Sequence, residues 1–134
     1  MNSILKLPIL LITLCWSGTQ LTAQDYQLAY AGRELISNEH VGNEWAFGVW
    51  LDEDSMDKDR PVRLTAGQRY DLAVAAEEAK EKYPDRGDNS ITFTTADLEK
   101  AAQDKGFYLE VTVTESNGRY AGGRAVWRFY FSLE

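Results

Sequence analysis

The densest group of side chains that could bind a ligand is an acidic run of eight residues after a hydrophobic segment. It offers carboxylates at Asp52, Asp54, Asp57 and Asp59. Calcium prefers oxygen ligands on flexible loops, so this run is a candidate calcium site. It is not an EF-hand, because Met56 stands where that loop needs an oxygen ligand and Asp57 where it needs glycine. A charged, solvent-exposed turn is the alternative interpretation.

The residues needed for most catalytic chemistry are scarce. His40 is the only histidine and Cys15 the only cysteine. A nucleophile needs a positioned base, and zinc, copper and haem sites need several nitrogen or sulfur ligands. A carboxylate pair for glycoside hydrolysis would need a deep cleft, for which a domain of this size has little room. We therefore expect a non-enzymatic protein whose only candidate cofactor is calcium.

Aromatic residues are the more informative surplus. Strand-like alternation places Trp50, Tyr108, Arg128 and Tyr130 on the sides opposite to the core-facing residues of their segments. Aromatic and arginine side chains on a sheet face are typical of recognition sites, so these four form the predicted binding face. The alternative is that they cover a second core beneath a helix or a long loop.

Alternating apolar and polar residues predict strands at 44–51, 107–114 and 127–133, with shorter ones near 26–30 and 91–93. Thr94 or Thr95 can cap a short helix near 95–105, which Gly106 would end. This pattern predicts a mostly β fold, an antiparallel two-layer sandwich that is broadly immunoglobulin-like, with one short helix.

The segment 61–83 supports two interpretations. Its composition favours a second helix near 66–83, which would make the fold α+β. Its period favours a hairpin, with strands on either side of the turn at 65–68. The stretch PVRLTAGQRYDLAVAA also resembles a strand-turn-strand piece of the cupredoxin domains of multicopper oxidases. That resemblance covers about 16 residues without a copper ligand, and it implies local structure only.

The last hairpin contains a conflict. Asn117-Gly118 is the strongest signal for a two-residue turn, but the register of such a turn would split the apolar residues of both strands between two faces. One extra residue in the second strand removes the conflict. We therefore predict a β-bulge at Gly122-Gly123.

The first 23 residues resemble a secretory signal peptide, with Lys6 followed by an apolar run that is too short for a permanent membrane span. Residues 24–134 are then expected to form a single β-rich domain in the periplasm or outside the cell. This part has 13 basic and 21 acidic residues, a net charge of −8. Such a charge disfavours nucleic acid and favours basic protein partners.

The expected function is recognition of a protein partner, a class that includes inhibitors and immunity-type proteins of the cell envelope. Two alternatives are a carbohydrate-binding module that uses exposed aromatics and a calcium-binding structural domain.

Overall fold

The computed structural model describes residues 25–79 and 82–134. The signal-peptide prediction for 1–23 therefore lies outside the described residues. The described residues form eight strands, with a 3₁₀ turn at Thr95–Leu98 and a short helix α2 at Glu99–Gln103 between the sixth and the seventh of them. The strands are β2 Tyr26–Asn38, β3 Trp45–Leu51, β4 Asp54–Ser55, β5 Val62–Leu64, β6 Tyr70–Glu78, β7 Arg86–Phe93, β8 Gly106–Thr114 and β9 Arg124–Leu133.

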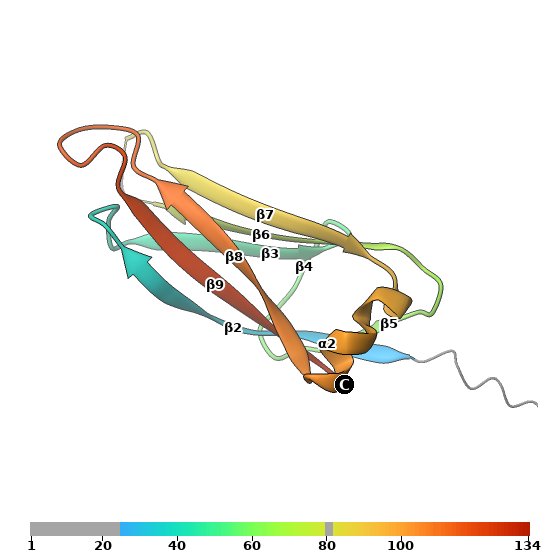
Figure 1. The fold of residues 1–134 in the computed structure, drawn as a ribbon. Coiled ribbons are helices and arrows are strands. Elements are labelled where there is room, and N and C mark those ends of the chain that lie inside the picture. The colour runs from blue at the N-terminus through green and yellow to red at the C-terminus, as the bar shows by residue number, and fades with distance from the viewer. Residues whose placement is uncertain (1–24, 80–81) are drawn as a thin grey trace, which may run out of the picture.

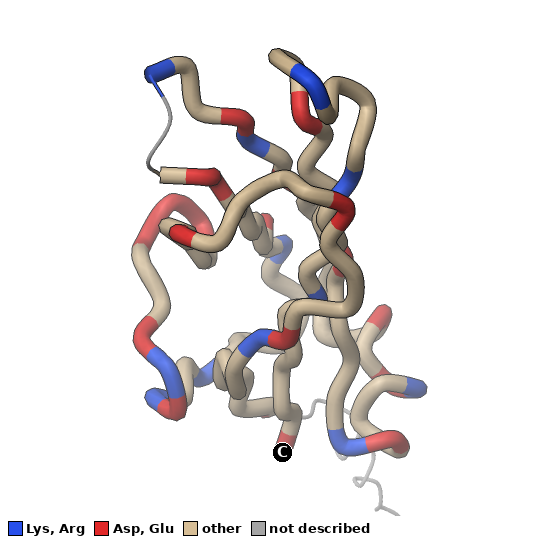
Figure 2. Tube along the Cα trace, turned by 90° about the vertical axis from the view of Figure 1, so that its left-hand side faces the viewer, with Lys and Arg blue, Asp and Glu red and all other residues tan. Residues whose placement is uncertain are grey.

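The strands form two antiparallel sheets that pack face to face (Figure 1). The first sheet has the order β5-β2-β9-β8 and the second has the order β4-β3-β6-β7. Figure 2 shows the two layers from the end of the molecule, with acidic and basic positions on both. The prediction of a mostly β, two-layer antiparallel sandwich with one short helix is confirmed.

The α+β alternative is wrong, because most of the ambiguous segment is strand β6. Tyr70, Leu72, Val74 and Ala76 are buried at every second position, which is the period of a strand and not of a helix. β6 pairs with β3 on one side and with β7 on the other. These pairings outweigh the helix propensity of its alanines and glutamates, since strand preference depends on the packing that surrounds a strand.

The expected hairpin between β5 and β6 does not form. β5 pairs with β2 in the first sheet, whereas β6 lies in the second. The turn between them is present: the Gln68 N–H donates to the Thr65 carbonyl at 3.2 Å, and Gly67 has a φ of 84°. The segment is thus strand-turn-strand, as its period predicts, but the turn carries the chain from one sheet to the other.

The β8–β9 hairpin confirms the predicted bulge. The Glu115 N–H donates to the Gly123 carbonyl and the Gly122 N–H donates to the Glu115 carbonyl, both at 2.8 Å. Two residues of the second strand therefore face one residue of the first. The two-residue turn is wrong, because the ladder ends at Thr114 and Arg124 and residues 115–123 form a longer loop.

The core lies between the sheets and follows the predicted alternation. Phe129 is fully buried, and its ring centroid lies 6.0 Å from that of Phe47 and 6.2 Å from that of Tyr30. Leu109, Val111 and the other inward residues of β8 complete the inner face of the first sheet. None of the helices within residues 25–79 and 82–134 is long and apolar enough to cross a membrane.

The two long sides of the sandwich differ. On one side β7 and β8 approach so closely that a side chain at Gly87 would collide with the carbonyl of Thr112. On the other side β2 and β3 face each other and are bridged by side chains: the Arg33 guanidinium lies 3.7 Å from the centroid of the Phe47 ring. We call these the closed side and the open side.

Candidate functional site

Three of the four residues of the predicted binding face come together on the outer surface of the first sheet. Tyr108 of β8 lies opposite Tyr130 of β9, and their ring centroids are 6.0 Å apart at an interplanar angle of 61°. The Arg128 guanidinium lies 4.2 Å from the centroid of the Tyr108 ring. Tyr108 is 50 % exposed, so no second core covers its ring.

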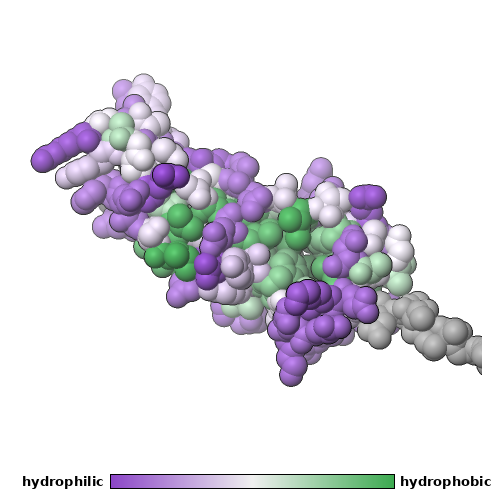
Figure 3. Space-filling view, viewed as in Figure 1, coloured by the Kyte–Doolittle hydropathy of each residue, from purple (hydrophilic) through white to green (hydrophobic). Residues whose placement is uncertain are grey.

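Two carboxylates hold this group in place. Arg128 donates two hydrogen bonds to Glu110, at 2.6 and 3.0 Å, and these bonds raise the pKa of Arg128 above its usual value. The Tyr130 hydroxyl donates to Glu34 of β2 at 2.7 Å. The five residues Glu34, Tyr108, Glu110, Arg128 and Tyr130 form what we call the tyrosine–arginine face. In the view of Figure 3, hydrophobic side chains gather along the middle of the molecule, with hydrophilic ones around them.

The structure does not bring Trp50 to this face. Trp50 belongs to β3, and β3 lies in the second sheet, where Trp50 pairs with Ala73. Its ring lies across Gly48, since a Cβ at Gly48 would be only 2.0 Å from the indole. Alternation shows correctly that Trp50 points outward, but the two outer surfaces lie on opposite sides of the sandwich.

The four carboxylates of the candidate calcium run do not converge. Asp57 accepts a hydrogen bond from Arg60 at 3.1 Å, Asp59 pairs with Lys58 at 2.8 Å, and Asp52 accepts the N–H of Asp71 at 2.8 Å. In the part of the chain that the structure describes, no group of three or more His, Cys, Asp or Glu residues is placed to hold a metal ion.

His40 lies at one end of the sandwich, in the connection between β2 and β3. Its ring stacks on Tyr120 of the β8–β9 loop, with centroids 4.2 Å apart and planes 18° apart. The single histidine therefore contacts an aromatic ring between two loops, away from the tyrosine–arginine face.

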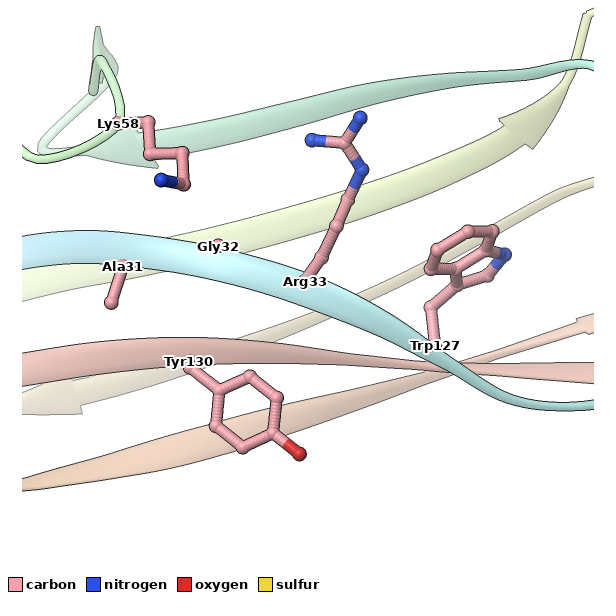
Figure 4. Close-up of a pocket in the computed structure, with 6 residues that line it drawn as sticks. All are labelled: Ala31, Gly32, Arg33, Lys58, Trp127 and Tyr130. Carbon is pink, nitrogen blue, oxygen red and sulfur yellow. The ribbon is translucent and has the colours of Figure 1, made fainter.

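Sequence analysis missed a group of residues next to this face. An open pocket of about 590 Å³ lies at the edge of β2 (Figure 4). Its lining consists of Ala31, Gly32, Arg33, Lys58, Trp127 and Tyr130. Tyr130 belongs to both the pocket and the face. The only feature of the sequence that could have indicated the pocket is Gly32-Arg33 after a predicted strand. The same pair is equally typical of the start of a loop.

No protein-family model and no curated protein sequence matches this chain.

Proposed function

We propose that this protein is an exported, non-enzymatic domain that binds a protein partner through the tyrosine–arginine face. The observation that carries the proposal is the mixture of groups on that surface: a half-exposed tyrosine, a second tyrosine and an arginine, interleaved with two carboxylates. Tyrosine and arginine are enriched among the residues that dominate binding energy at protein interfaces.

The fixed geometry of the face also supports this function. Arg128 is held by Glu110 and stacked on Tyr108, and Tyr130 is held by Glu34. Side chains that are already ordered lose little conformational entropy when a partner binds. The net charge of −8 on residues 24–134 favours a basic partner, because opposite fields accelerate encounter. An inhibitor or immunity-type protein of the cell envelope fits this description.

A carbohydrate-binding module is the second candidate, and Trp50 favours it. The indole lies across Gly48 on the outer surface of the second sheet, as a stacking platform for a sugar ring would. The tyrosine–arginine face is less suitable, since its two tyrosine rings are inclined by 61° and do not form a flat row.

A capture experiment from cell-envelope extract tests the proposal. The wild-type protein is compared with the double variant Tyr108→Ser/Arg128→Ser and with Tyr83→Ser, which removes an exposed tyrosine from the β6–β7 connection. We expect wild type and Tyr83→Ser to capture the same protein in stoichiometric amount, and the double variant to lose it. Capture that is unchanged in the double variant would contradict the proposed face. Retention on polysaccharide that depends on Trp50, with no protein captured, would favour the second candidate.

A further inference from the structure

The pocket on the open side begins where β2 loses its neighbour. β5 pairs with β2 only from Tyr26 to Leu28, and the Asp59 N–H then donates to the Tyr30 carbonyl at 2.8 Å. Among the residues that the structure describes, no strand pairs with this edge of β2 from Gly32 onward. The edge is therefore open beside the pocket.

An irregularity brings Lys58 over this edge. The register between β2 and β9 shifts between Tyr30 and Gly32. Gly32 has a φ of 128°, and a Cβ at this position would lie 3.2 Å from the Cε atom of Lys58. Because Gly32 has no side chain, there is room for Lys58 beside it, and the pocket is not filled at this point.

Arg33 is a second cation with a fixed position. It lies 3.7 Å from the centroid of the Phe47 ring, and its Nη1 donates to the Tyr30 hydroxyl at 3.2 Å. Within residues 25–79 and 82–134, no ion pair joins Arg33 to a carboxylate. In Figure 4 the guanidinium of Arg33 and the ammonium of Lys58 lie on the same side of β2.

The charges in this pocket match a monoanion. Lys58 is already partly neutralised by Asp59, whose carboxylate lies 2.8 Å from the ammonium and raises its pKa. Arg33 therefore contributes the one uncompensated positive charge. A planar guanidinium binds a carboxylate through two parallel hydrogen bonds, and the Trp127 ring in the pocket lining can pack against an apolar group that carries the carboxylate.

We propose that this pocket is a binding site for an organic carboxylate, held by Arg33 with Lys58 beside it. The proposal goes beyond the protein-binding function and does not depend on it. The carboxylate could belong to a free organic acid or to an acidic side chain of a protein, and the chemistry of recognition is the same.

Nuclear magnetic resonance titration of the ¹⁵N-labelled protein tests the site. The probes are benzoate and its uncharged analogue benzamide, followed by the peptide Ac-Val-Glu-Val-NH₂ and its Gln counterpart. We expect benzoate to shift the amide signals of Gly32 and Arg33 and the indole N–H signal of Trp127, and benzamide to leave them unchanged. The relative affinities of benzoate and the Glu peptide distinguish a free acid from a protein side chain.

Variants complete the test. Arg33→Gln should weaken benzoate binding about tenfold, because it removes charged hydrogen bonds. Arg69→Gln, which removes an exposed arginine from the β5–β6 turn, should leave the affinity unchanged. The proposal is overturned if neither carboxylate shifts these signals, if benzamide acts like benzoate, or if Arg33→Gln binds as tightly as wild type. A response to inorganic phosphate in place of the carboxylates would also overturn it.

Discussion

The two long sides of the sandwich close by different means. On the closed side, β7 lies directly against the backbone of β8: Gly87 lies against the Thr112 carbonyl, and the Asn89 side chain donates to the Glu110 carbonyl at 3.0 Å. On the open side, β3 is joined to the first sheet by side chains: Arg33 of β2 lies over the Phe47 ring, and the Trp127 ring of β9 lies 4.7 Å from it. Backbone contact leaves little space, whereas side-chain bridging leaves a pocket.

The closed side is suited to stabilising the fold, whereas the open side leaves space in which a ligand can bind. The pocket draws its residues from β2, β9 and the segment that holds Lys58. The tyrosine–arginine face shares Tyr130 with the pocket but also takes Tyr108 and Glu110 from the outer surface of β8. We therefore expect substitutions on the closed side to affect mainly the free energy of unfolding, and substitutions of exposed residues on the open side to affect mainly binding.

The largest expected difference in the free energy of unfolding is between two Gly→Ala substitutions, one on each side of the sandwich. Gly87→Ala would place a Cβ 2.2 Å from the Thr112 carbonyl oxygen, and because that atom belongs to backbone, we expect a loss of about 3 kcal/mol in the free energy of unfolding. Gly32→Ala would meet only the flexible end of Lys58 and some backbone strain, and should cost about 1 kcal/mol. Urea unfolding of both variants measures the difference. Equal losses would show that the sides do not differ in this way.

Phe47→Ala should be the most destabilising side-chain change on the open side. The ring is half-buried and contacts Trp127, Phe129 and Arg33, so we expect a loss of about 2 kcal/mol, less than for a fully buried phenylalanine. Thermal unfolding followed by tryptophan fluorescence measures it, and Phe47→Leu is the control that keeps most of the apolar volume. A change below the error of the measurement would mean that the open side contributes nothing to the core.

Arg33→Gln should reduce stability by less than about 1 kcal/mol, since a cation over an aromatic ring at an exposed site contributes little. The same variant is expected to lose carboxylate binding. Urea unfolding and the benzoate titration, carried out on one preparation, compare the two effects. A large loss of stability would assign Arg33 to the fold and not to recognition.

The smallest effect is expected for Asn89→Ala on the closed side. This variant removes the hydrogen bond to the Glu110 carbonyl, and because both groups are near solvent, we expect about 0.5 kcal/mol. Hydrogen exchange of the amides of β7 and β8 should reveal the local loosening. Faster exchange in β2 instead would contradict the division between the two sides.

Much of the fold could be predicted from local patterns. The alternation in 44–51, 107–114 and 127–133 identifies the inward residues of β3, β8 and β9, and the register conflict predicts the bulge at Gly122-Gly123. The prediction of a tight turn at Asn117-Gly118 was wrong, because the loop is longer and contacts a second loop: Tyr120 stacks on His40 of the β2–β3 connection. The length of β2 was underestimated, because the β-bulges interrupt its alternation.

The sequence by itself determined which side of each strand faces the core, because successive side chains of a strand point to opposite faces whatever its neighbours are. Only the tertiary structure decided which strands share a sheet. Sheet membership depends on pairing between distant segments, so it separated Trp50 from Tyr108 and placed Lys58 beside Arg33. The candidate pocket exists for that reason alone: its residues come from three segments that meet where β2 has no neighbouring strand.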